Sequence, residues 1–158
     1  MNKKQLLERL AELEAENATL KHDRAFGGLT RPGLEAEFER RKHEAQYSVF
    51  IDLDGIHALN EANHGNYDVV DGMIRRALTL RYDDLVFFGR WKSGDEVVFI
   101  VHANPDGFIA RLLENLKAQG LSATCAAVKI ENGDLTAAVQ AGIKQVAAIK
   151  AGRPNKTR

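Results

Sequence analysis

The pattern of apolar and polar positions separates a helical lead from a region of mixed helices and strands. Residues 2–23 are rich in Leu, Glu, Ala and Lys and contain neither glycine nor proline. Two sets of positions there recur every seven residues, namely Leu6, Leu13 and Leu20, and Lys3, Leu10 and Asn17. These sets form the d and a positions of a short heptad pattern, which predicts a parallel coiled coil.

The polar residue within this heptad pattern indicates how many helices assemble. An asparagine at an a position, here Asn17, favours a two-stranded register at some cost in stability, so we expect a homodimer. A helix of about three heptads is marginal alone and gains stability from a partner. The alternative is an amphipathic helix that packs on its own domain.

The rest of the chain alternates between helical and strand periodicity. Glycines at 27, 28 and 33 break the first helix, and Thr30 followed by Pro32 is typical of a cap and first turn. We predict helices at 34–45, 56–63, 69–80, 104–120 and 135–150, strands at 47–53 and 121–130, and a hairpin at 85–101. This order predicts an α+β, ferredoxin-like βαββαβ core, in which right-handed crossovers make the first and third strands central neighbours.

Acidic residues stand at two strand ends of this predicted core. Apolar runs at 85–88 and 97–101 flank a polar hairpin tip that carries Asp95 and Glu96. The first strand ends with Asp52 and Asp54, which share one face because strand side chains alternate. The topology places that strand end beside the hairpin tip, so we expect the four acids to converge.

Converging carboxylates make an oxygen-rich site of the kind that Mg²⁺ or Mn²⁺ prefers. Asp52 and Asp95 are the first choices for metal ligands, with the Leu53 carbonyl as a further oxygen. Glu96 serves either the metal or a general base. Such a site suits nucleotidyl transfer, in which metal ions bridge phosphate oxygens and offset charge on a leaving pyrophosphate. The alternative is that acids at strand ends are merely solvated.

Composition narrows the class of protein. The 158 residues contain 22 Lys plus Arg and 22 Asp plus Glu, so no broad attraction to nucleic acid or to an anionic membrane is expected. Cys125 is the single cysteine, which favours a small core residue over a disulfide or a nucleophile. No apolar run approaches the ~20 residues of a membrane span, and no signal peptide precedes the helix, so we expect a cytoplasmic protein.

The turn Ser93-Gly94-Asp95-Glu96-Val97 resembles the motif that names the GGDEF-domain diguanylate cyclases. Further matching segments follow that family's order, namely Asp52-Leu53-Asp54, Asn60-Glu61 and Lys150 to Arg153. The resemblance covers residues 23–155. It implies a nucleotidyl-cyclase palm at 24–158 behind a coiled-coil signalling helix at 1–23.

The resemblance also implies an activity. Two GTP molecules, one on each protomer of a dimer, would condense to cyclic di-GMP with release of two pyrophosphates. The coiled coil would then raise the effective concentration of one half-site near the other. One rival is a degenerate module that binds GTP or cyclic di-GMP without turnover and signals to a partner. Another is an interaction protein that binds no nucleotide.

Several substrate contacts are implied in the same way. Ser93 and Gly94 would let the backbone approach phosphate closely. Asn60 can pair with a guanine edge through its amide, and Asp68 and Asp71 compete to accept from the guanine N1 and N2 hydrogens. For Asp68 the alternative is a helix N-cap.

The residues that contact phosphate in the family are only partly matched in this chain. His57 stands where the family usually has a lysine, so a point charge is lost unless the imidazole protonates. Lys150 and Arg153 resemble the family's late phosphate contacts, although Ile149 holds the place that matches the lysine. The alternative is a solvated basic tail.

Two spacings in and before the hairpin also differ from the family. Arg90 lies one residue further from the turn acids than the family pattern has it, and Lys92 is interpreted as an inserted turn residue. Arg81 and Asp84 have the form of the family's product-inhibition site, but residues 85–92 make a longer spacer to the signature turn. A longer hairpin would account for that offset. The alternative is a helix-terminal arginine and a turn aspartate.

Overall fold

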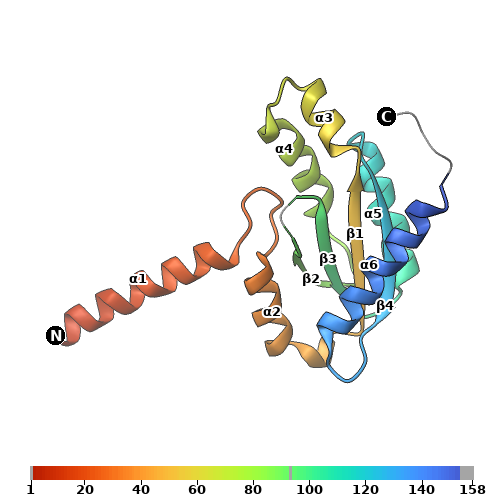
Figure 1. Cartoon of the computed structure of the whole chain (residues 1–158). Helices are drawn as coiled ribbons and strands as arrows, with labels where there is room; N and C mark the ends of the chain where they lie inside the picture. The colour runs from red at the N-terminus through yellow and green to blue at the C-terminus, as the bar shows by residue number, and fades with distance from the viewer. Residues whose placement is uncertain (1, 93, 154–158) are drawn as a thin grey trace.

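The computed structural model describes residues 2–92 and 94–153, with the backbone alone for residues 17–20. A long helix, α1 (Lys3–Lys21), projects from a domain in which helices flank a sheet (Figure 1). The domain contains α2 (Arg31–Arg40), the 3-10 turn η1 (Lys42–Glu44), β1 (Tyr47–Asp54), α3 (Ile56–Ala62), α4 (Tyr67–Leu78), β2 (Leu85–Arg90), β3 (Glu96–Val101), α5 (Pro105–Ala118), β4 (Ser122–Lys129) and α6 (Leu135–Ala151).

The sheet confirms the predicted topology. Its strands lie in the order β2-β3-β1-β4, and each neighbouring pair is antiparallel. The first and third strands are therefore central neighbours, as a ferredoxin-like core requires. This arrangement puts the end of β1 next to the start of β3, where the hairpin turns.

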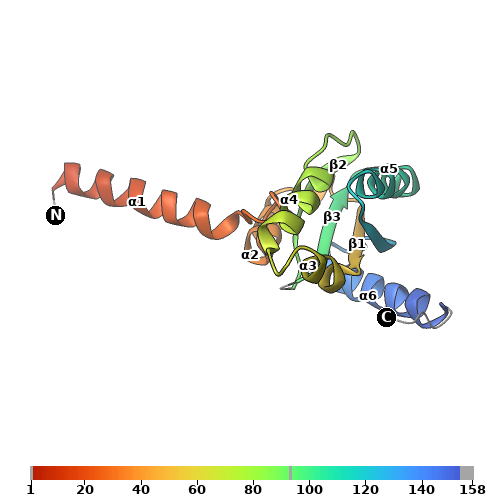
Figure 2. The ribbon, with the colours of Figure 1, turned by 90° about the horizontal axis from the view of Figure 1, so that it is seen from above.

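The two faces of the sheet bury separate cores. Val49, Ile51 and Leu53 pack with α4 and α5, whereas Phe50 packs with α2 and α6. Figure 2 shows α5 and α6 on opposite sides of β1. Since side chains alternate along a strand, Asp52 and Asp54 continue the row of Phe50 and face α6. The polar end of β1 is thus directed at the C-terminal part of that helix.

Most predicted elements are present with shifted ends. The helix expected at 34–45 begins earlier, because Thr30 accepts a hydrogen bond from the Gly33 N–H and proline stands in the first turn, and it gives way to the turn η1 at Lys42. The helix expected at 69–80 is α4, two residues earlier at both ends. The pairing of β2 with β3 shifts register between Leu85 and Phe87. That bulge accommodates a residue of the long hairpin.

Helix α1 does not pack on its own domain along residues 3–16, so the amphipathic alternative is wrong for that part of the chain. The described side chains of this stretch are exposed, including Leu6, Leu7, Leu10 and Leu13 at 45–56%. Main-chain bonds fix the far end, where Thr30 N–H donates to the Lys21 carbonyl. None of the described helices has the length and apolar character to span a bilayer.

Two residues to which the sequence assigns no chemistry belong to the interior. Trp91 is 2% exposed and packs in the core beneath α2, with the Arg31 guanidinium 3.9 Å from its ring centre. Cys125 is partly buried against the other core, and burial raises the pKa of its thiol to about 12. A thiol that stays protonated at neutral pH is a poor nucleophile, as expected for a packing residue.

Candidate functional site

The structure brings the end of β1 and the hairpin tip together at one corner of the sheet. Asp52 lies directly opposite Glu96 in the β1–β3 register. The Leu53 N–H donates to the Asp95 carbonyl at 3.0 Å, so the pairing continues into the turn. The end of β1 and the hairpin tip therefore share one small region, which neither strand could form alone.

The carboxylates of this corner are partly buried and repel one another when ionised. Burial raises the pKa of Asp95, and the nearby Asp52 carboxylate raises it further, against the opposing effects of Arg90 and Lys150. Burial also raises the pKa of Glu96, with Asp52 and Asp95 adding to the effect and Lys92 opposing it. Acids that disfavour one another's ionised form create a place where a cation is stabilised.

Among the described residues, no group of three or more His, Cys, Asp or Glu side chains is placed to hold a metal ion. Mg²⁺ does not require such a group, because it is usually bound by one or two carboxylates together with substrate phosphates and water. Asp52 and Asp95 provide two carboxylates at the corner. The donor chemistry therefore fits a magnesium ion that arrives with a phosphate ligand.

Two cations from the end of α6 also reach the corner. The Lys150 Nζ lies 2.8 Å from Asp52 Oδ2 and 3.5 Å from Asp54 Oδ1. The Arg153 Nη1 lies 3.7 Å from Asp54 Oδ2. Both side chains therefore form ion pairs with the acids of β1 while they remain partly exposed to solvent. Ile149, at the place that matches the family's lysine, is 47% exposed.

Arg90 fixes the hairpin turn from the other side. Its Nε donates to Asp23 Oδ2 at 2.6 Å, and its Nη1 donates to the Gly94 carbonyl at 3.1 Å. The guanidinium also lies 3.6 Å from the ring centre of Phe26. Arg90 thus links the end of α1 to the turn that carries Asp95. Sequence reasoning noted the spacing of Arg90 but assigned it no contact.

The turn itself needs glycine at one position. Gly94 has φ +100°, a conformation that residues with a side chain rarely adopt, and a Cβ built there would meet nothing within 4 Å. A bulky ligand could approach the main chain at this point. Ser93 lies outside the described residues, so its expected phosphate contact stays a prediction.

The residues expected to read a base lie on α3 and α4. Asn60 has a buried Oδ1 that finds no partner in the described part of the chain. Asp71 is half-buried, and burial raises its pKa. The Asp68 and Asp23 carboxylates raise this pKa further, whereas the Arg90 guanidinium lowers it. Asp68 is exposed in the first turn of α4, and the N-cap position belongs to Asn66, so the N-cap alternative is wrong.

Asp68 and Asp71 also line a cavity of about 430 Å³. The other lining residues are Arg24 and Ala25 from the segment after α1, and Arg75 from α4. The Arg75 Nη1 donates to the Arg24 carbonyl at 3.1 Å, which ties the two walls together. Both predicted base-reading acids therefore border the same hollow, which lies between α4 and the junction with α1.

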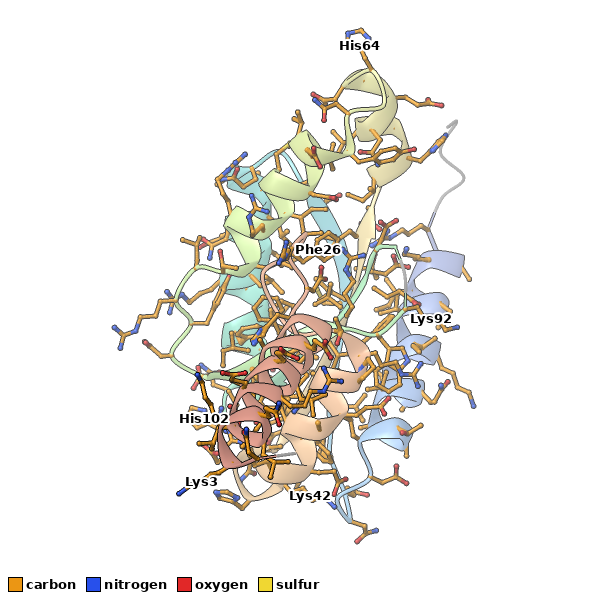
Figure 3. The ribbon with its side chains drawn as sticks, turned by 90° about the vertical axis from the view of Figure 1, so that its left-hand side faces the viewer. Lys3, Phe26, Lys42, His64, Lys92 and His102 are labelled. Atoms are coloured by element: carbon orange, nitrogen blue, oxygen red, sulfur yellow. The ribbon has the colours of Figure 1, made fainter. Side chains whose placement is uncertain are left out.

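Other predicted residues lie apart from this corner. His57 is 90% exposed on its side chain, and its Nε2 lies 3.0 Å from Glu61 Oε1, the carboxylate one turn further along α3. The loop that follows α3 also lies away from the sheet, as the position of His64 in Figure 3 shows. Arg81 and Asp84 precede β2 and so lie at the opposite end of that strand from the tip. The Asp84 carbonyl accepts a hydrogen bond from the His102 N–H at 3.0 Å.

No family model matches the sequence, and no curated protein does. Solved structures do match. The coiled coil and GGDEF domain of DgcB from Caulobacter crescentus, in complex with cyclic di-GMP, superposes with a TM-score of 0.69 at 15% identity, covering 97% of this chain and 93% of that one. A microbial GGDEF domain with cyclic di-GMP gives 0.65 at 22% identity, over 84% and 95%.

The diguanylate cyclase SiaD from Pseudomonas aeruginosa, in complex with its activator SiaC, also has this fold. Its TM-score is 0.66 at 19% identity, and the match covers 96% of this chain and 66% of SiaD. The chain therefore has the fold of GGDEF domains, as its motifs predicted. At these identities the likeness establishes the fold, and the chemistry has to be argued from the site.

Proposed function

We propose that this protein, with its GGDEF fold, is a diguanylate cyclase that condenses two GTP molecules to cyclic di-GMP and two pyrophosphates. The observation that carries the proposal is the corner where Asp52 faces Glu96 across the β1–β3 pair. Asp95 precedes Glu96 at this corner, and Lys150 adds positive charge from α6. Two of the similar solved structures are GGDEF domains in complex with cyclic di-GMP, which supports a guanine nucleotide as the ligand.

The acids divide between metal and proton roles. Asp52 and Asp95, with the Leu53 carbonyl, would hold Mg²⁺ or Mn²⁺. Such an ion lowers the pKa of an attacking hydroxyl and offsets charge on the leaving pyrophosphate. Burial raises the pKa of Glu96, which makes its carboxylate a better proton acceptor than a solvated glutamate.

The substrate contacts follow from where the side chains lie. Lys150 and Arg153 would bind phosphate oxygens, and the main chain at Ser93 and Gly94 would approach them closely. Asn60 would pair with the guanine edge through its amide, whose Oδ1 is buried and has no partner within the described structure. Asp71 is the better of the two candidate acids for the guanine N1 and N2 hydrogens, because it is half-buried whereas Asp68 is exposed.

The reaction requires two such sites facing each other. The 3′-oxygen of one GTP forms a bond to the α-phosphorus of the other, and the bond from that phosphorus to the pyrophosphate oxygen breaks. The hydroxyl proton passes to Glu96 or to water, and pyrophosphate leaves with the bonding electrons. One protomer holds half of this arrangement, so a homodimer is part of the proposal.

The test is incubation with GTP and Mg²⁺, followed by chromatography of the nucleotides. We expect cyclic di-GMP from the wild-type chain and a loss of more than 100-fold, an order-of-magnitude estimate, in Asp95→Ala and Glu96→Ala. Glu114→Gln on the exposed side of α5 is the control and should retain activity. Unchanged turnover in the two site variants would remove the mechanism.

A second candidate is a module that binds GTP or cyclic di-GMP without turnover. It is favoured by His57, which pairs with Glu61 where the family usually has a phosphate-binding lysine. Calorimetry with GTP beside the product assay separates the two, because the module would bind nucleotide and yield no product. If the protein is instead an interaction protein that binds no nucleotide, calorimetry with GTP and Mg²⁺ would detect no heat of binding.

A further inference from the structure

A buried hydroxyl on β4 connects the acids of β1 to the basic end of α6. Thr124 is 3% exposed and lies opposite Asp52 in the β1–β4 register. Its Oγ1 donates to the Asp54 carboxylate, 3.2 Å from Oδ1 and 3.4 Å from Oδ2. The same oxygen accepts a hydrogen bond from Arg153 Nη2 at 2.7 Å. One hydroxyl thus joins an anion to a cation.

Asp54 differs from Asp52 in what it contacts. Asp54 lies within 3.5 Å of Lys150 and 3.7 Å of Arg153, and it also receives the Thr124 hydroxyl. Asp52 also contacts Lys150, and it lies opposite Glu96 in the β1–β3 pair. The two aspartates of β1 therefore share Lys150, but only Asp54 contacts Thr124 and Arg153.

We propose that Asp54 and Thr124 are positioning residues that hold Arg153 and Lys150 ready for the phosphates of the nucleotide. This inference rests on the proposed function. If Asp52 held a divalent cation, that carboxylate would attract the Lys150 ammonium less strongly. Asp54 would still attract the ammonium and keep Lys150 at the corner, where it could bind phosphate. In this role Asp54 holds the two basic side chains and does not bind the metal.

The burial of the group favours this role over a solvated surface cluster. Thr124 is almost fully buried and accepts from Arg153 Nη2, whereas the Arg153 side chain as a whole is 44% exposed, so the guanidinium is fixed on one side and partly open to solvent. A guanidinium has five N–H donors. Those that do not bond Thr124 or contact Asp54 can meet phosphate oxygens in a planar, two-point contact.

The test uses inorganic tripolyphosphate with Mg²⁺ in calorimetry, and Mn²⁺ alone in electron paramagnetic resonance. Thr124→Val keeps the side-chain shape and removes the hydroxyl. We expect about tenfold weaker tripolyphosphate binding, as for the loss of a hydrogen bond to a charged group, with unchanged Mn²⁺ affinity. Thr124→Ser should restore binding. Thr136→Val, an exposed threonine near the start of α6, is the matched control and should bind as wild type.

Asp54→Asn keeps the assay decisive if the valine variant does not fold, because the Asp54 side chain is 25% exposed. It should weaken tripolyphosphate binding and retain Mn²⁺. Wild-type phosphate affinity in Thr124→Val, or loss of Mn²⁺ binding in Asp54→Asn, overturns the positioning role while leaving the proposed function standing. If the wild-type chain binds neither tripolyphosphate nor GTP, both proposals fall together.

Discussion

Asp95 lowers stability where it is ionised. A carboxyl whose pKa is higher in the folded chain than in the unfolded chain binds its proton more tightly when folded, so stability falls as pH rises from the ordinary carboxyl range through the raised value. Above that range the loss is complete. Asp95→Asn cannot ionise, so we expect it to be more stable than wild type at pH 7.

Urea unfolding of both chains at pH 7 and near pH 4 measures this effect. The difference between Asp95→Asn and wild type should shrink at the lower pH, where the wild-type carboxyl also becomes neutral. Asp83→Asn, whose carboxylate is 79% exposed beside Arg111, is the control and should show little gain. A variant less stable than wild type at pH 7 would contradict the assigned burial effect.

Cys125 gives a second test at the scale of one residue. With a pKa of about 12, only about one thiol in 10⁴ is ionised at pH 8, so iodoacetamide should label the folded chain very slowly. Labelling should become fast in concentrated urea. Ser122→Cys in a Cys125→Ala background puts the thiol at an exposed position of the same strand, and it should react quickly when folded. Equal rates for the two thiols would contradict the burial of Cys125.

At the scale of elements, Arg90 joins the end of α1 to the hairpin. Its partner Asp23 has a side chain that is 12% exposed, so loss of the guanidinium leaves a poorly solvated carboxylate. We expect Arg90→Gln to lower the free energy of unfolding by about 2 kcal/mol. Asp23→Asn combined with Arg90→Gln should cost less than the sum of the single changes.

A double-mutant cycle in urea measures that coupling. Arg31→Gln supplies a comparison, because Arg31 pairs with the exposed Glu35 and should couple weakly to it. Additive costs for Arg90 and Asp23 would mean that the 2.6 Å contact contributes no coupling energy. Any loss in Arg90→Gln would then come from the hydrogen bond to the Gly94 carbonyl and the cation–π contact with Phe26.

The hydrophobic pattern predicts the elements and their order, and topology rules then predict which strands are neighbours. The convergence of Asp52 with Glu96 follows from those rules. The link from Asp54 to Thr124 does not, because it depends on the register of β4, which is far along the sequence. A helix turns by 100° per residue, so a one-residue displacement changes the direction of the side chain, yet Lys150 is long enough to reach Asp52.

Contacts that depend on local irregularity were also beyond sequence reasoning. The bulge at Val86 and the early end of α2 change spacings by a residue or two, which periodicity does not resolve. The pairing of His57 with Glu61 follows the spacing of one helical turn and was predictable in principle.

At the scale of the whole molecule, α1 presents leucines for which the domain offers no cover along residues 3–16. Figure 1 shows this helix extending away from the sheet, so it can reach another copy of the chain without disturbing the fold. A second α1 in parallel register would bury the a and d positions of both helices. The two domains would then be tethered at the same end, which raises the effective concentration of one site for the other.

We therefore expect Leu10→Glu combined with Leu13→Glu to convert a dimer to a monomer in sedimentation experiments, because paired glutamates cannot pack in a helical seam. The domain should melt as in wild type, since neither side chain touches it. Turnover of GTP should fall by tenfold or more, an order-of-magnitude estimate from lost effective concentration, and should recover partly at high protein concentration. Leu80→Glu changes an exposed leucine outside α1 and should alter neither property. A double variant that stays dimeric would contradict the role of α1 in dimerisation. A monomeric variant with full turnover would contradict the need for a dimer in the proposed reaction.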